Sequence, residues 1–211
     1  MTSGGRLDAG IVIGNTFNKH ESRNPLVRWT MRRFEDSMFR LLATLEPVRS
    51  VLEVGCGEGF VTASLARAFP DARVLGTDFS QLMVDEARRR HPQREFQTCS
   101  IYDVEALGSF DLVVGCEVLE HLEDPDRALR ALNAAATGHV LVTVPREPLW
   151  RILNVLRGKY WSALGNTDGH LQHWSRGAFT RFVAQRMDVV AVRSPLPWTQ
   201  VLARRRPGRR S

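Results

Sequence analysis

The sequence predicts a single α/β domain built on a mostly parallel β-sheet that helices cover on both faces. Short apolar runs alternate with segments of helical periodicity from residue 49 to residue 145, as in sheets whose strands are buried on both faces. The stretch VLEVGCGEGF at residues 51–60 also places a glycine-rich loop between an apolar run and the helical segment after it. In open α/β sheets, ligands bind at such strand-to-helix loops.

Each element is predicted from its period and its terminal residues. The apolar runs predict seven strands, at residues 49–54, 72–78, 94–100, 110–118, 138–145, 187–194 and 198–205. The segments between them predict helices at residues 60–69, 80–91, 124–136 and 175–186, and a short helical turn at 103–107. Ser80 and Asp124 precede two of these helices and suit the N-cap position, and Pro125 suits a first helical turn.

Two regions lie outside this alternation. Residues 16–47 are amphipathic and predict an N-terminal helical cap. Its predicted apolar face comprises Trp29, Met31, Phe34, Met38, Phe39 and Leu42. Residues 146–175 form an insertion, predicted to lie on the substrate side. Residues 1–203 are thus predicted to form one domain.

The charge is concentrated at the C-terminus. The formal net charge of the 211-residue chain is +6, and five arginines fall within residues 204–211, which leaves residues 1–203 with a net charge of +1. A nearly neutral body gives no electrostatic argument for a nucleic-acid partner. We expect the basic tail, residues 204–211, to be solvated and disordered.

The cysteine content indicates a reducing compartment. Cys56, Cys99 and Cys116 are odd in number and lie in or beside apolar runs, which favours reduced thiols and a cytoplasmic location over a disulfide framework. The sequence contains no apolar run of about 18 residues, the length that a membrane-spanning helix needs.

The glycine loop limits the choice of ligand. A dinucleotide site has the spacing G-x-G-x-x-G, whereas this loop reads Gly55-Cys56-Gly57-Glu58-Gly59. The acid Glu53, two residues before the first glycine, would repel a pyrophosphate. It suits a ligand with a cationic group, such as S-adenosylmethionine.

Three motifs in order strengthen this interpretation: LEVGCGEG at residues 52–59, GTDFS at 76–80 and CEVLEHLEDP at 116–125. With them the chain resembles the class I S-adenosylmethionine-dependent methyltransferases, in particular the ubiquinone-biosynthesis O-methyltransferase type. The resemblance covers residues 50–145 most clearly. It implies a Rossmann-like, doubly wound sheet with an antiparallel C-terminal strand, and S-adenosylmethionine as cofactor.

The resemblance also implies roles for the matched residues. Glu53, Gly55, Cys56 and Gly57 would line the methionine end of the cofactor. Asp78 would accept the ribose hydroxyls, and Phe79 and Met83 would pack near the adenine. The family often has an acid after the third strand; here Ser100 and Ile101 occupy that position, and Asp103 is interpreted as a helix cap. We also assign Cys116 and Glu117, at the end of the fourth strand, to the cofactor pocket.

The stretch CEVLEH supplies candidates for catalysis. Glu117, Glu120 and His121 would share one face if a helical turn begins at Glu117. His121 is a candidate general base because the reference pKa of histidine is near neutrality. Glu120 is a second catalytic candidate. The same three side chains could instead hold a divalent metal ion, or they could be structural; the preferred assignment has no metal.

The insertion supplies another candidate base, His170, in the stretch GHLQHWS. The alternative is that Ser175 caps the following helix, Trp174 fills the core, and the histidines bond loop carbonyls. Residues 147–161 are amphipathic and fit either a lid packed on its own core or a peripheral membrane contact.

These observations predict methyl transfer to a small-molecule acceptor, with a hydroxyl of a lipophilic or aromatic metabolite as the favoured target. Two alternatives remain: methylation of nucleic acid or protein, and binding of S-adenosylmethionine without catalysis. The near-neutral body and the absence of an Asn/Asp-Pro-Pro-aromatic motif after the fourth strand count against nucleic acid. Oligomeric state is not predicted.

Overall fold

The computed structural model describes residues 6–8, 11–13, 22–45, 47–148 and 171–207. Within these residues one sheet has seven strands in the order β5-β4-β3-β6-β7-β9-β8. The strands are β3 (Ser50–Val54), β4 (Arg73–Asp78), β5 (Glu95–Thr98), β6 (Phe110–Cys116), β7 (Ala136–Pro145), β8 (Asp188–Arg193) and β9 (Trp198–Arg204). Strands β3 to β7 pair in parallel, and β9 pairs antiparallel with β7 and β8. The predicted fold is therefore confirmed.

The helices follow the predicted alternation. They are α1 (Pro25–Leu42), α2 (Phe60–Ala68), α3 (Gln81–Arg90), α4 (Pro125–Ala135) and α6 (Arg176–Ala184), with 3-10 helices η1 (Ile101–Leu107) and η2 (Leu119–His121). A short antiparallel hairpin, β1 (Arg6–Asp8) and β2 (Ile11–Ile13), was not predicted. No helix among the described residues has the length and apolar content to cross a bilayer.

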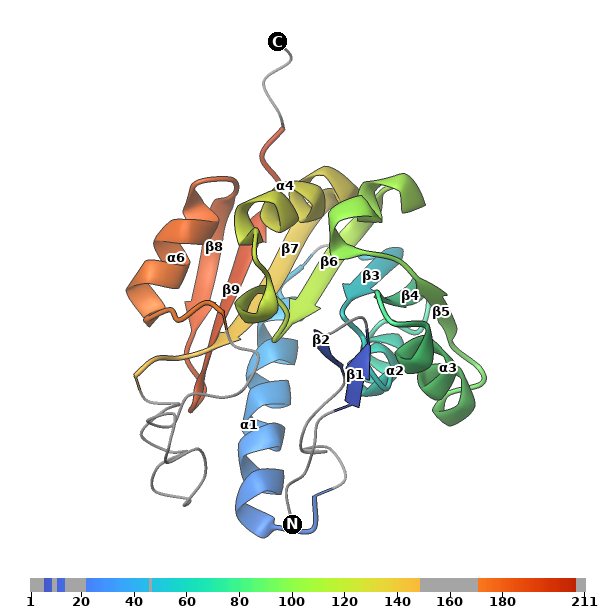
Figure 1. Cartoon of the computed structure of the whole chain (residues 1–211). Coiled ribbons are helices and arrows are strands. Elements are labelled where there is room, and N and C mark those ends of the chain that lie inside the picture. The colour runs from blue at the N-terminus through green and yellow to red at the C-terminus, as the bar shows by residue number, and fades with distance from the viewer. Residues whose placement is uncertain (1–5, 9–10, 14–21, 46, 149–170, 208–211) are drawn as a thin grey trace.

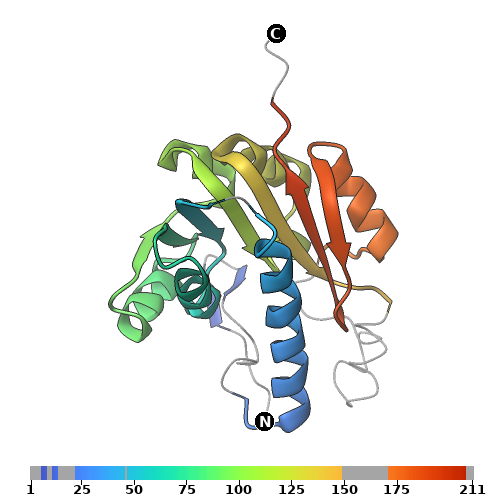
Figure 2. The same cartoon turned by 180° about the vertical axis from the view of Figure 1, so that it is seen from behind.

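The sheet is covered on both faces because successive strand residues point to opposite sides. In β3, Val51 packs in the cluster that contains α1 and α2, whereas Leu52 packs in the cluster that contains η1, α4 and α6. Both side chains are fully buried. Figure 1 shows α4 in front of the sheet, and Figure 2 shows α1 in front of the opposite face.

Helix α1 is the helical segment predicted within residues 16–47, and it lies against the sheet. Asn24 caps its N-terminus, where the side chain accepts a hydrogen bond from the first turn. Phe34 packs against Trp198 of β9 with ring centroids 5.0 Å apart, and Gln200 Nε2 donates to the Phe34 carbonyl at 2.9 Å. The predicted apolar face is wrong at Trp29, which is 49% exposed.

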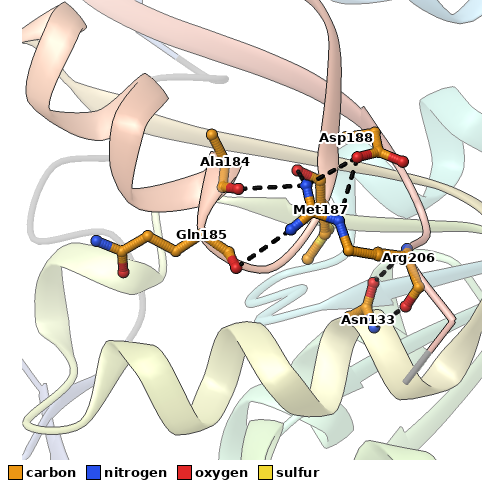
Figure 3. A network of polar contacts seen from close by, with 6 residues as sticks. All are labelled: Asn133, Ala184, Gln185, Met187, Asp188 and Arg206. Atoms are coloured by element: carbon orange, nitrogen blue, oxygen red, sulfur yellow. Dashed lines mark hydrogen bonds and ion pairs between the residues drawn. The ribbon is translucent and has the colours of Figure 1, made fainter. Parts of the chain in front are cut away.

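The tail prediction is wrong for its first residues. Strand β9 extends to Arg204, and the Arg205 N–H donates to the Gly138 carbonyl at 2.8 Å. The Arg206 side chain donates to Asp188 Oδ1 at 2.8 Å, and its main chain exchanges two hydrogen bonds with the Asn133 side chain (Figure 3). The same guanidinium donates to three carbonyls at the end of α6 and the start of β8: Ala184, Gln185 and Met187. Residues 208–211 lie outside the described part.

Candidate functional site

The site is built where β3, β4 and β6 end, at the lower edge of the sheet in Figure 1. Because these strands are parallel, their carboxyl ends and the loops that follow them meet at one edge. The glycine loop follows β3, Asp78 ends β4, and η2 follows β6.

The glycine loop turns where only a small residue fits. Gly55 has φ 72°, a left-handed conformation that costs other residues energy, and a Cβ there would lie 2.4 Å from Val118 Cγ2. The loop after β3 thus contacts the loop after β6. Gly57 also has positive φ, 51°, but a Cβ there would meet nothing within 4 Å. Cys56 between them is buried, and its N–H donates to the Thr77 carbonyl at 2.8 Å.

Asp78 is held in place by main-chain donors. Its Oδ2 accepts from the Gly57 N–H and its Oδ1 from the Ser80 N–H, both at 3.0 Å. The side chain is only 7% exposed. A carboxylate fixed at the end of the second parallel strand suits the hydroxyls of a ribose.

Glu53 is the second acid of the site, and it is 2% exposed. Its carboxylate accepts a hydrogen bond from Thr62 Oγ1 of α2. Burial, opposed by this hydrogen bond and assisted by the negative charge of Asp78, raises the pKa of Glu53 to about 8. A buried carboxyl group with few donors fits a cationic partner, because pairing with a positive charge favours ionisation. The ammonium of S-adenosylmethionine is such a partner.

The residues assigned to the adenine side differ in exposure. Phe79 follows Asp78 and is 43% exposed, whereas Met83 in α3 is 1% exposed. Ser100 is the N-cap of η1: its hydroxyl accepts from the Tyr102 N–H at 3.3 Å, and Ile101 next to it is buried.

The interpretation of Asp103 as a cap is wrong. Ser100 occupies the cap position, and Asp103 lies in the first turn of η1, where its carboxylate faces Arg127 at 3.8 Å. The hydroxyl of Ser100 already satisfies the Tyr102 N–H, a main-chain donor of the first turn, so the cap position is occupied.

The CEVLEH stretch does not form the expected single turn. Glu117 has φ 56° and ends the strand, while its N–H donates to the Thr143 carbonyl at 3.0 Å. The helical turn begins only at Leu119. Glu120 is 1% exposed, whereas Glu117 and His121 are half-buried. The expectation of one shared face at i, i+3 and i+4 is therefore wrong.

A metal site is not indicated at this stretch. Across the described residues, no group of three or more His, Cys, Asp or Glu side chains is arranged to hold a metal ion.

Burial raises the pKa of the Cys116 thiol well above its usual value, and burial likewise raises the pKa of the Cys56 thiol. All three cysteines are free thiols.

Part of the acceptor side lies outside the described residues. His170 and most of the predicted insertion, residues 149–170, belong to that part. Its two flanks are described and are tied to each other and to η2. The Glu147 N–H donates to the Trp174 carbonyl at 2.9 Å. The N–H groups of Leu171 and Gln172 donate to the Glu120 carbonyl at 2.8 and 3.0 Å.

At the end of the insertion, the structural alternative to catalysis is confirmed for Ser175 and Trp174. Ser175 caps α6, where its hydroxyl accepts from the Ala178 N–H at 3.3 Å. Trp174 packs against Phe179 and Phe182 with ring centroids 5.4 Å away from each. These two residues are therefore structural. His173 is exposed.

Comparison with known proteins supports the predicted resemblance. Residues 52–138 match the family model described as a methyltransferase domain. This match, the curated relatives and the solved structures confirm the resemblance to the class I S-adenosylmethionine-dependent methyltransferases that the sequence predicted. S-adenosylmethionine is the cofactor of these methyltransferases, and solved structures similar to this chain hold it or its product.

Two curated relatives and one solved structure illustrate the similarity. The trans-aconitate 2-methyltransferase of Methylobacterium radiotolerans is 35% identical over 64% of this chain and 56% of its own length. The ubiquinone biosynthesis O-methyltransferase of Acinetobacter baylyi is 28% identical over 60% of this chain and 62% of its own. The chain thus spans less than two thirds of the length of these relatives.

The solved structure is the magnesium protoporphyrin IX methyltransferase of Synechocystis PCC 6803 with bound SAH. It superposes with a TM-score of 0.67 and 20% identity, covering 88% of this chain and 89% of that one. This similarity supports the fold.

Sequence reasoning missed Thr62 and Val118. Thr62 lies in α2 and contacts Glu53, and Val118 lies in the loop before η2 and packs against Gly55. The signal for Thr62 is a hydroxyl in the first turn of the largely apolar stretch FVTASLA, on the helix that follows the strand holding Glu53.

Proposed function

We propose that this chain binds S-adenosylmethionine at the carboxyl edge of the sheet and transfers its methyl group to a small-molecule acceptor. The observation that supports this most is the pair of buried acids at adjacent strand ends. Asp78 is oriented by two main-chain N–H groups and Glu53 by a hydroxyl. One acid suits two ribose hydroxyls, and the other suits an ammonium group.

Each acid and loop has a role in this proposal. Asp78 would accept the ribose hydroxyls, with Phe79 and Met83 on the adenine side. Glu53 would pair with the amino group, and the main chain of residues 55–57 would line the methionine end. Ser100 and Ile101 would border the adenine edge, and Cys116 and Glu117 would form the wall between cofactor and acceptor.

The chemistry makes few demands beyond placement. The cofactor supplies an activated methyl group on a sulfonium. The protein has to place the acceptor atom in line and exclude water, and such orientation is worth up to about 7–11 kcal/mol in favourable systems. A hydroxyl acceptor must also lose a proton. We assign its removal to an imidazole nitrogen of His121, with His170 as the second candidate.

Glu120 takes a supporting role in the proposal. Its side chain is 1% exposed and its carbonyl accepts two N–H groups from residues 171 and 172. A buried residue tied to the end of the insertion is suited to hold η2, and with it His121, in one position.

We further propose that the acceptor is a hydroxyl of a lipophilic or aromatic metabolite. The support is indirect. The residues before the tail carry little net charge, and one curated relative is named an O-methyltransferase of ubiquinone biosynthesis. Residues 147–161 would give such a metabolite an apolar approach, as a lid or as a peripheral membrane contact.

The proposal is tested with the purified chain, methyl-labelled S-adenosylmethionine and an extract of the source cells, with and without a chelator. Label in the organic fraction that His121→Ala abolishes would support an O-methyltransferase of a lipophilic metabolite. Label in macromolecules would contradict the small-molecule proposal. Cofactor binding without transfer to any fraction would favour a binding protein. Loss of transfer with the chelator would return a metal ion to the mechanism.

A further inference from the structure

Thr62 is the residue of the site that no motif identifies. It lies in the first turn of α2 and is completely buried. Its Oγ1 donates to the Glu53 carboxylate, which is itself 2% exposed. The hydroxyl therefore fixes the orientation of a buried acid that faces the methionine end of the proposed cofactor site.

The neighbouring strand is shaped to admit this hydroxyl. Gly76 of β4 pairs directly with Glu53 of β3. A Cβ at Gly76 would lie 2.6 Å from Thr62 Oγ1 and 2.7 Å from Phe96 Cδ1. Atoms do not approach this closely, so any larger residue at position 76 would displace the Thr62 side chain from Glu53.

The main chain of Glu53 is fixed by other groups. Thr77 Oγ1 donates to the Glu53 carbonyl at 3.0 Å, and β3 is paired on both sides, with β4 and with β6. Removal of the Thr62 hydroxyl would therefore leave the backbone in place. Its effect would fall on the carboxylate alone.

The surroundings of the carboxylate explain why one hydroxyl has a large effect. Among the residues that the structure describes, the titratable groups whose charges act on Glu53, or on which Glu53 acts, are Asp78, Cys56 and Cys116. None of them is a cation. A hydrogen bond to the charged form of a carboxyl group favours ionisation. Thr62 provides it through its hydroxyl and also through its main-chain N–H, and the hydroxyl has the larger effect on the pKa of Glu53.

We propose that Thr62 is a positioning residue for the cofactor: its hydroxyl holds the Glu53 carboxylate so that this carboxylate binds the ammonium of the methionine moiety. This inference rests on the proposed function. It predicts that Thr62 acts on one half of the cofactor. In the proposed function the ribose and adenine would contact Asp78 and the loops after β4 and β5, and Asp78 is oriented by the Gly57 and Ser80 N–H groups rather than by Thr62.

The test compares two ligands that differ in this half. S-adenosylhomocysteine carries the ammonium and carboxylate of the amino acid, whereas 5′-methylthioadenosine is a thioether of the same nucleoside without them. Calorimetry measures both dissociation constants for the wild type, for Thr62→Val, which keeps the side-chain shape, and for Thr62→Ser, which keeps the hydroxyl. Circular dichroism confirms that each variant is folded.

We expect Thr62→Val to weaken S-adenosylhomocysteine binding by about tenfold or more, the usual effect of one hydrogen bond to a charged group. Methylthioadenosine binding should change by less than about twofold, a difference within the scatter of surface substitutions. Thr62→Ser should restore most of the loss. If Thr62→Val does not fold, Thr62→Ala removes the hydroxyl without adding a methyl group at the same place and serves instead.

A double-mutant cycle separates positioning from structure. In a Glu53→Gln background, Thr62→Val should have no further effect on S-adenosylhomocysteine, because two residues that act through one contact are not additive. Equal weakening of both ligands by Thr62→Val, or full affinity for S-adenosylhomocysteine in that variant, would overturn the inference while leaving the proposed function intact. If the wild type binds neither ligand, the proposed function fails and this inference with it.

Discussion

The two halves of the carboxyl edge are built differently. At the ends of β3 and β4, two acids are oriented by nearby donors. Glu53 accepts a hydrogen bond from Thr62 in the first turn of α2. Asp78 accepts from the N–H groups of Gly57, in the glycine loop, and of Ser80, just after β4. After β6 and β7, the short helix η2 is held by residues about 50 positions away, since the Glu120 carbonyl accepts from the Leu171 and Gln172 N–H groups.

This difference indicates which half would bind a common cofactor and which would select the acceptor. The first half depends on backbone geometry and on two carboxylates, so two short motifs, at residues 52–59 and 76–80, specify it. The second half depends on how a distant segment returns to the sheet. A family that uses one cofactor with different acceptors needs this arrangement, and function then belongs to the site rather than to the fold.

The largest expected effect is on Asp78. Asp78→Ala removes the acceptor of the Gly57 and Ser80 N–H groups and the proposed partner of both ribose hydroxyls. Hydrogen bonds to charged groups contribute about 1.5–3 kcal/mol each, so we expect at least about a hundredfold loss of S-adenosylhomocysteine affinity by calorimetry. Asp71→Ala, at an exposed position before β4, is the matched control. Unchanged affinity in Asp78→Ala would mean that the cofactor does not bind at this half of the edge.

The contact between the two halves gives the next largest effect. Gly55→Ala introduces a Cβ against Val118 at a left-handed backbone position, and we expect about 2–4 kcal/mol of destabilisation from the clash and the strain together. Gly57→Ala is matched for backbone conformation but has open space at Cβ, so about 1–2 kcal/mol is expected. Urea unfolding measures both.

A further variant tests whether the clash with Val118 causes the extra destabilisation of Gly55→Ala over Gly57→Ala. In Gly55→Ala combined with Val118→Ala, the neighbouring side chain is shortened, and the loss should approach that of Gly57→Ala. Equal losses for Gly55→Ala and Gly57→Ala would mean that the two loops do not press on each other.

The fold was predictable because its strands are apolar runs buried on both faces. The segment 49–54 reads as such a run and becomes β3 at Ser50–Val54. Asp124 caps α4 as predicted, with its side chain accepting from the Arg127 N–H at 2.9 Å. These features depend on residues close together in the chain. The antiparallel direction of β9 was implied by the resemblance.

The errors at Glu117 and Arg206 share a physical cause, which is dependence on distant partners. Glu117 takes φ 56° because its N–H is paired with Thr143 of β7, and no local pattern encodes that. Arg206 reads as part of a solvated tail, but Asn133, 73 residues earlier, fixes its main chain. Thr62 was overlooked because its partner lies across the strand-to-helix turn.

The pH dependence of cofactor binding tests the chemistry of the first half. The pKa of Glu53 is raised from 4.5 to about 8 by burial. If the ammonium pairs with the ionised form, binding of S-adenosylhomocysteine should strengthen as pH rises towards and through 8, by up to about tenfold between pH 7 and 8.5. Calorimetry at a series of pH values measures this, and Glu53→Gln should flatten the profile.

The same group makes a prediction for stability with a definite sign. In the unfolded chain Glu53 loses its proton near its ordinary pKa, 4.5, while the folded protein keeps the proton until about pH 8. The folded state therefore binds more protons in this window, and the contribution of Glu53 to stability falls as pH rises from about 4.5 to 8. A contribution that rises over this window in the wild type relative to Glu53→Gln would contradict the assignment.

The smallest effect is expected at the opposite edge of the sheet. Arg206 follows β9, whose end pairs with His139 near the start of β7, so it lies away from the loops proposed to bind the cofactor. Its ion pair with Asp188 is about half exposed on both sides and contributes little alone. The carbonyls at the end of α6 add to it, and about 1–2 kcal/mol of destabilisation is expected for Arg206→Ala.

Arg204→Ala is the matched control, because Arg204 is an exposed arginine of the same segment, and it should change stability by less than about 0.5 kcal/mol. Urea unfolding measures both variants, and calorimetry should find the S-adenosylhomocysteine affinity unchanged in each. A loss of affinity in Arg206→Ala would mean that the α6–β8 edge is coupled to the cofactor loops. The two edges of the sheet would then not be independent, and the sheet itself would carry the coupling between them.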